Sequence, residues 1–201
     1  MKSPVTGFIA MLSICVTTAA AQPNEETLIR DLYRRGLVGE KEAVEQCIAK
    51  LEAVLKSEAK NQVARVYLGS AYTLRSRDLG FGPKKLQVLK QGLALMDQAV
   101  AAAPDDPKVR LPRALTTASL PGVFGRGAST RKDFELLAAQ AKRTPGNFDE
   151  GELQIVFYNA GLAAKAAGDK ARAAAFLEEA LRHPADTALS GKVSTELARL
   201  Q

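Results

Sequence analysis

Hydrophobic residues recur at intervals of three and four positions along most of this 201-residue chain, which is the spacing of helices that bury one face. The pattern predicts antiparallel helix pairs, with turns near residues 36–39, 74–86, 120–130 and 168–169. We expect a last helix from about Thr187, with Asp186 as its N-cap. Trp is absent, and Ala, Leu, Lys, Arg and Glu dominate, so the expected fold class is all-α.

One helix pair, residues 154–186, shows a regular arrangement of large and small side chains. Phe157 stands early in the first helix, Gly161 stands where the two helices would cross, and Gly168 lies in the turn. The second helix continues the spacing with Ala173, Leu177 and Ala180. Small residues at a crossing let two helices approach, and large residues fill the remaining groove. The segment resembles a tetratricopeptide repeat (TPR), with its closing proline displaced by one position to Pro184.

A second helix pair has the same pattern with an interruption. The matching residues are Leu68, Gly69 and Tyr72 in the first helix and Gly92, Met96, Ala99 and Pro104 in the second. The spacing between them exceeds that of an ordinary repeat by roughly eleven residues. We therefore expect an inserted tip at residues 74–86, used in part to lengthen the two helices, with the second helix starting near Pro83.

Two further units, residues 26–58 and 105–145, follow the design less clearly. In the second of them, Pro112 is expected to kink its helix or displace the start of that helix. Thr130 and Asp133 have the spacing of an acidic capping box at the start of the return helix. The resemblance implies a single TPR-like domain over residues 22–201. That domain would be a right-handed superhelical array of about four antiparallel hairpins plus a C-terminal capping helix.

The resemblance also implies an interaction module with a protein or peptide partner, because inner helices of TPR arrays line a concave groove that binds such segments. The groove positions would be Val66, Tyr67, Ser70 and Thr73 in the second unit and Tyr158, Asn159, Leu162 and Lys165 in the last. The version that clamps a chaperone's terminal carboxylate is not expected. Its companion lysines are missing here, since valine stands at positions 63 and 66.

Arginines gather around the two long turns. Arg75 and Arg77 lie in the first turn and Arg126 in the second, while Arg110 and Arg113 share a helix face that leads to the second. Neighbouring hairpins stack in register, so the two turns should meet on one edge of the array. One reading is an anion-binding edge, because a guanidinium grips a carboxylate or phosphate in two places.

The other reading of these arginines is structural. They would pair with nearby carboxylates, and the aromatic residues of the two turns would plug the gap beneath. The acidic partners would be Asp78, Asp97 and Asp133, and the aromatic residues Phe81 and Phe124.

The N-terminus has the order of a secretory signal peptide, with Lys2, an apolar run and three alanines before Gln22. We expect residues 1–21 to be removed after Ala21 and the protein to be exported, as a periplasmic or secreted protein. The apolar run is too short to span a bilayer comfortably, and no second run follows. Lipidation at Cys15 is disfavoured by Ile14 before it. Cleavage would leave Cys47 as the only cysteine, on the buried face of a helix.

No catalytic, metal-binding or phosphate-loop motif is present, and no cofactor is expected. His183 is the only histidine and is expected at the surface, at a helix end whose dipole it favours. The net charge of +6 suits an anionic partner, but no basic tract with interleaved aromatics predicts nucleic-acid binding. The sequence thus predicts a non-enzymatic, exported scaffold or adaptor. The alternative is a soluble binding protein for a small or polymeric anion. The oligomeric state is left open.

Overall fold

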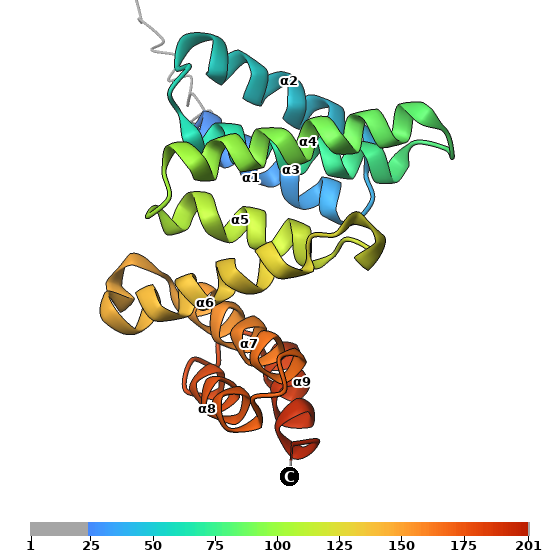
Figure 1. Ribbon diagram of the computed structural model, residues 1–201. Coiled ribbons are helices and arrows are strands. Elements are labelled where there is room, and N and C mark those ends of the chain that lie inside the picture. Colours follow the sequence, from blue (N-terminus) through green and yellow to red (C-terminus); the bar gives the residue numbers. More distant parts are fainter. Residues whose placement is uncertain (1–23, 201) are drawn as a thin grey trace, which may run out of the picture.

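The structure is a computed structural model that describes residues 24–200, and in this range it consists of α-helices and two short 3-10 turns (Figure 1). The helices are α1 (Glu25–Leu37), α2 (Lys41–Ser57), α3 (Gln62–Asp78), α4 (Pro83–Ala102), α5 (Pro107–Ala118), α6 (Gly127–Arg143), α7 (Glu150–Ala166), α8 (Lys170–Leu181) and α9 (Thr187–Ala198). The 3-10 turns are η1 (Gly122–Phe124) and η2 (Pro145–Asn147). None of these helices is long and apolar enough to cross a membrane.

Consecutive helices form four antiparallel hairpins, α1–α2, α3–α4, α5–α6 and α7–α8, and α9 packs on the last of them. The hairpins stack one after another from α1 to α8 in Figure 1. The all-α array of four hairpins with a closing helix is therefore confirmed. The predicted signal peptide, residues 1–21, lies outside the described residues.

Helix starts are fixed by side chains that satisfy the free backbone N–H groups of the first turn. At six helices the side-chain oxygen of the N-cap residue accepts a hydrogen bond from such a backbone N–H group. These N-cap residues are Asn24, Asn61, Asp106, Asp149, Asp169 and Asp186. At α7 the box is complete, because the Glu152 carboxylate also accepts from the backbone N–H of Asp149 at 3.0 Å. The predicted cap at Asp186 is confirmed.

Two hairpins cross at glycines, as the repeat pattern predicts. A Cβ atom added to Gly69 would lie 2.6 Å from the carbonyl oxygen of Gly92, so α3 and α4 touch backbone to backbone. A Cβ atom on Gly161 would lie 2.8 Å from Cγ of Leu177 across the α7–α8 crossing. These approaches leave the large side chains to fill the core on either side.

The expected tip at residues 74–86 is mostly helix. α3 continues to Asp78 and α4 begins at Pro83, so only four residues, 79–82, connect them. The insertion therefore serves chiefly to lengthen the two helices, and Arg75 and Arg77 lie in the last turn of α3. Phe81 does not plug a gap, because its side chain is fully exposed.

The structure excludes one of the two expected effects of Pro112, because α5 begins at Pro107 and runs through this buried proline without a displaced start. The expected capping box at the start of the return helix is wrong. α6 begins at Gly127, which places Thr130 inside the helix, where its hydroxyl donates to Thr117 Oγ1 at 2.8 Å. Asp133 is buried in ion pairs and caps nothing. Both side chains that the capping box requires are therefore bonded to side chains of α5.

Candidate functional site

The predicted arginines at the third hairpin surround one buried carboxylate. Asp133 on α6 is only 2% exposed and accepts from Arg110 Nη1 at 2.7 Å. Arg113 Nε donates to its second oxygen at 2.9 Å, and Arg113 Nη2 donates to the first at 2.6 Å. Charge-assisted bonds of this kind compensate the desolvation of a buried ion. Arg110 and Arg113 of α5 are thus joined to α6.

A second carboxylate, Asp97 on α4, extends this network across the neighbouring hairpin. Arg113 Nη1 donates to Asp97 at 3.2 Å, and Arg126 Nη2 donates to it at 2.7 Å. Phe124 packs on the apolar cluster that includes Leu89 and Leu93 of α4, as the structural reading expects. The turn between α5 and α6 is therefore fixed to the face of α4.

Arg75 and Arg77 join the first two hairpins. Arg75 Nε donates to Glu45 of α2 at 2.7 Å, and its guanidinium lies 5.1 Å from the centre of the Tyr72 ring. Arg77 Nη2 donates to the carbonyl oxygen of Gly36 at 2.9 Å and Arg77 Nε to Asp78 at 2.8 Å. Glu45 is a partner that the sequence pattern did not indicate.

The concave face of the first hairpins holds fewer accessible residues than the repeat pattern suggests. Val66, Ser70 and Thr73 are buried. The Ser70 hydroxyl lies 2.7 Å from the Tyr33 hydroxyl and 2.6 Å from that of Thr116, which links α1, α3 and α5. These three positions are therefore closed to a partner by the stacking of the inner helices.

Tyr67 stays partly exposed on α3 and packs edge-to-face on Tyr33, with ring centres 5.2 Å apart. Burial raises the pKa of Tyr67, with further increases from Tyr33 and the Glu152 carboxylate and an opposing effect of Arg30. Tyr67 therefore presents only part of its ring to solvent on α3.

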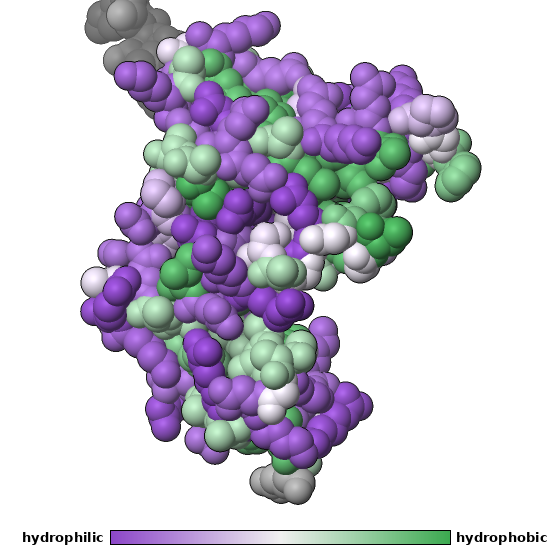
Figure 2. Space-filling model, viewed as in Figure 1, coloured by the Kyte–Doolittle hydropathy of each residue, from purple (hydrophilic) through white to green (hydrophobic). Residues whose placement is uncertain are grey.

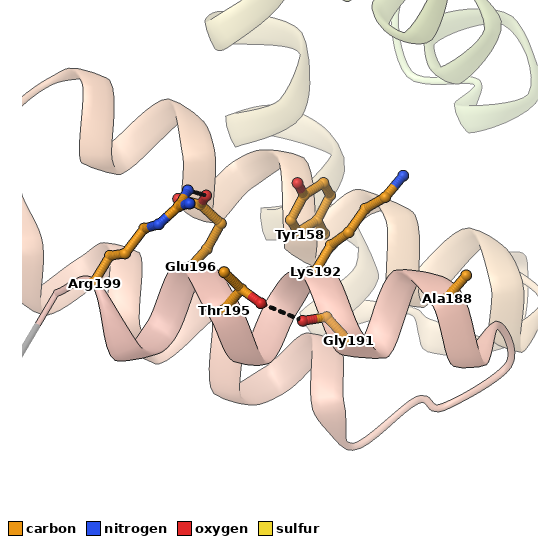
Figure 3. Close-up of a pocket in the computed structure, with 7 residues that line it drawn as sticks. All are labelled: Tyr158, Ala188, Gly191, Lys192, Thr195, Glu196 and Arg199. Carbon is orange, nitrogen blue, oxygen red and sulfur yellow. Dashed lines mark hydrogen bonds and ion pairs between the residues drawn. The ribbon is translucent and has the colours of Figure 1, made fainter.

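Tyr158 and Asn159 lie next to each other on α7 but play different roles. Asn159 Nδ2 donates to the carbonyl oxygen of Ile155 at 2.8 Å, so its amide is engaged by its own helix. Tyr158 is partly exposed and lines a shallow pocket of about 400 Å³ between α7 and α9 (Figure 3). The remaining lining residues all come from α9 or its end: Ala188, Gly191, Lys192, Thr195, Glu196 and Arg199.

Charged groups of both signs surround this pocket. Glu196 accepts from Lys165 Nζ at 2.6 Å and from Arg199 Nη1 at 2.5 Å, and the hydrogen bond with Lys165 lowers the pKa of Glu196. In Figure 3 the Lys192 ammonium extends past the Tyr158 ring on the open side. The sequence reading treated α9 only as a cover. The pocket-lining residues Lys192, Thr195 and Arg199 recur every three or four positions, which was the signal in the sequence for a polar face opposite the apolar one.

The remaining reactive side chains do not assemble a site. The His183 side chain is 20% exposed, its ring stacks on Phe157 with 5.8 Å between centres, and its Nδ1 lies 2.9 Å from Glu150. Cys47 is buried as predicted, and burial raises the pKa of its thiol to about 11. In residues 24–200 no group of three or more His, Cys, Asp and Glu residues is placed to hold a metal ion.

No known protein family matches the chain, and no curated protein matches it significantly. Among solved structures, the chain is similar to a thermophilic TPR protein of Thermus thermophilus, with a TM-score of 0.63 and 16% sequence identity. The match covers 88% of this chain and 82% of that chain. An identity this low establishes the fold alone. The chain is thus a TPR-like helical repeat protein.

Proposed function

We propose that the protein is an exported, non-enzymatic scaffold that holds a segment of another protein against its inner helices. The observation that carries the proposal is the partial exposure of Tyr67 and Tyr158 on the inner helices α3 and α7. Tyrosine combines a large apolar ring with a polar tip, which suits it to interfaces. Lys192, Glu196 and Arg199 line the same pocket as the Tyr158 ring, so an extended segment finds charged partners beside this aromatic anchor.

Binding of a small anion by the arginines is less favoured by the geometry. Arg75, Arg110, Arg113 and Arg126 already donate to carboxylates of the chain, and Arg77 donates to Asp78 and to two backbone carbonyls. A free anion would have to displace these intramolecular partners. For Arg110 and Arg113 the partner to be displaced is the buried carboxylate of Asp133.

A photoreactive phenylalanine analogue placed at position 67 or at position 158 in the native cell tests the proposal. We expect both positions to form a covalent adduct with the same protein. The same analogue at Leu136, an exposed residue of the outer helix α6, is the matched control and should form none. Equal adducts at Leu136, or none at the two inner positions, would contradict an inner-face scaffold.

The cross-linked segment of the partner then gives a peptide for a binding measurement. We expect Tyr67→Ala with Tyr158→Ala to weaken that peptide at least tenfold, because truncated aromatic anchors cost most at interfaces. Binding is measured at a temperature at which circular dichroism shows the variant to be folded, since both rings also pack on the core. Export is checked separately, by cell fractionation and by the mass of the purified chain, which should begin at Gln22.

A further inference from the structure

Exposed large hydrophobic residues gather at the free ends of the first three hairpins. Six such residues occur in the described part of the chain, and five of them lie at these ends. They are Leu37 and Val38 at the α1–α2 turn, Phe81 and Leu86 at the α3–α4 turn, and Val123 in the α5–α6 turn. Only Leu136 lies elsewhere. Exposed apolar residues are ordinary when scattered, but a group on one part of a surface indicates a contact.

The three hairpin ends occupy one edge of the molecule, on the right-hand side of Figure 1. Arg77 fixes the first two ends together, because it donates from α3 to the carbonyl oxygens of Gly36 and Leu37. The third end is held on α4 by Phe124 and by the pairing of Arg126 with Asp97. Figure 2 shows hydrophobic residues at the outer ends of the second and third hairpins on this edge. We call these three ends, residues 34–42, 75–90 and 118–133, the tip edge.

The tip edge also carries the basic excess of the protein. Its three segments contain eleven Lys and Arg residues against four Asp and Glu residues. The rest of the 201-residue chain contains seventeen against eighteen. Several of the basic residues form no ion pair within residues 24–200, namely Lys41, Lys84, Lys85, Lys90, Arg131 and Lys132.

Phe81 is the most exposed large apolar residue of the tip edge. Its relative exposure is 107%, so its side chain touches almost nothing in the protein. Gly80 and Gly82 flank it, and beyond the adjoining residues no atom lies within 4 Å of a Cβ placed on either glycine. Val38 and Val123 are 84% and 87% exposed at the neighbouring ends. The apolar side chains therefore project outward from convex tips and do not line a hollow.

We propose that the tip edge docks on a lipid bilayer that contains anionic lipids, with Phe81, Val38 and Val123 entering the interfacial region. Projecting apolar side chains bury their surface among the lipid headgroups and acyl chains, and surrounding lysines are attracted to anionic headgroups. A bilayer accepts three separate projecting tips without a matching pocket for each, whereas a folded acidic protein would need such pockets. Tyr67 and Tyr158 lie outside the three segments of the tip edge, so this inference is independent of the proposed scaffold function.

The absence of tryptophan from the whole sequence gives a direct test. Phe81→Trp introduces a single fluorescent reporter at the tip, and Leu136→Trp introduces one at the exposed apolar residue outside the tip edge. With vesicles of phosphatidylethanolamine and phosphatidylglycerol, the Phe81→Trp emission should shift to shorter wavelength and be quenched by brominated lipids. The Leu136→Trp emission should stay unchanged. An unchanged Phe81→Trp spectrum, or equal shifts at both positions, overturns the proposal.

Vesicle sedimentation measures separately how much the apolar side chains and how much the lysines of the tip edge contribute to binding. We expect Phe81→Ser with Val123→Ser, and Lys84→Gln with Lys85→Gln, each to reduce the bound fraction at least tenfold, and added salt to weaken the wild type. Lys56→Gln with Lys60→Gln is the matched charge control outside the tip edge and should bind like the wild type. All variants share the same N-terminus, so any contribution of residues 1–23 is common to them. Equal binding by all variants would overturn the proposal.

A soluble acidic protein is the competing occupant of the tip edge. Its signature would be binding of a polyglutamate probe that is lost with Lys84→Gln and Lys85→Gln, together with no binding to anionic vesicles. That outcome would also overturn the bilayer proposal. The side chains at 81, 84 and 123 are exposed, and Lys85 is half-buried with its ammonium 3.5 Å from the carbonyl oxygen of Leu79. Circular dichroism melts of each variant show whether a change in binding comes with a change in stability.

Discussion

Gln154 of α7 and Asp186, the N-cap of α9, exchange two hydrogen bonds. The Asp186 backbone N–H donates to Gln154 Oε1 at 2.8 Å, and Gln154 Nε2 donates to the Asp186 carbonyl oxygen at 3.2 Å. Gln154 Nε2 also donates to Ser190 Oγ at 2.9 Å, and the Gln154 side chain is fully buried. A buried amide with all these partners in place pins the closing helix to the last hairpin.

Gln154→Leu is expected to lower the free energy of unfolding by about 1–3 kcal/mol, because it leaves buried polar groups of the α9 start without partners. Hydrogen exchange should show the amides of α9 losing protection before those of α7. Gln46→Leu, at an exposed position of α2, is the control and should change stability little. Uniform loss of protection along the chain would show that α9 does not open separately.

Asp133→Asn removes the shared partner of Arg110 and Arg113 and leaves buried guanidinium charge uncompensated. We expect a loss of about 3–5 kcal/mol in urea unfolding. Asp97→Asn offers a comparison within the same network, since the Asp97 side chain is 43% exposed, and should cost about 1 kcal/mol or less. Similar losses in the two variants would contradict a network centred on the buried carboxylate.

Gly69→Ala forces a methyl group against the backbone of α4, where its Cβ would lie 2.6 Å from the Gly92 oxygen. The two helices must then separate, and we expect a loss of about 1–3 kcal/mol in thermal unfolding. Gly191→Ala is the matched control in α9, with no atom within 4 Å of the added Cβ, and should stabilise the protein by about 0.5–1 kcal/mol. A destabilised control would indicate that alanine is harmful for another reason.

Cys47 should make stability depend on pH in the alkaline range. Burial raises the pKa of its thiol to about 11 in the folded protein, so folding favours the protonated thiol. This contribution is complete below the unfolded pKa and is lost as the pH rises through the folded pKa, between about 9 and about 11. Relative to Cys47→Ala, the wild type should therefore lose free energy of unfolding over that window, measured by urea titration. A constant difference between the two proteins would contradict a buried thiol.

Local interactions made much of the architecture predictable. The spacing of apolar residues sets helix faces, Asp186 caps the helix that follows it, and the glycines of the second and fourth hairpins mark the crossings. All of these depend on side chains within a few residues or within one repeat. The same logic failed at Thr130 and Asp133, because partners on α5 compete with the local capping box.

The candidate site was only partly predictable for a related reason. The repeat pattern correctly places Tyr67 and Tyr158 on inner helices, but it also nominates Ser70, which the stacking of α1, α3 and α5 buries. The pairing of Arg75 with Glu45 and the pocket beside Lys192 join segments 30 or more residues apart. No local pattern specifies such contacts.

The sequence by itself determined the helices, their pairing into hairpins and the glycine crossings, because these follow from periodicity and from interactions inside one repeat. Only the tertiary structure decided which arginines brace the array, how α9 shapes the pocket at Tyr158, and that exposed apolar residues share one edge. These features depend on the angle at which each hairpin stacks on the next. That angle is set by the packing of side chains that lie far apart in the sequence, so it is defined only once the hairpins have packed against one another.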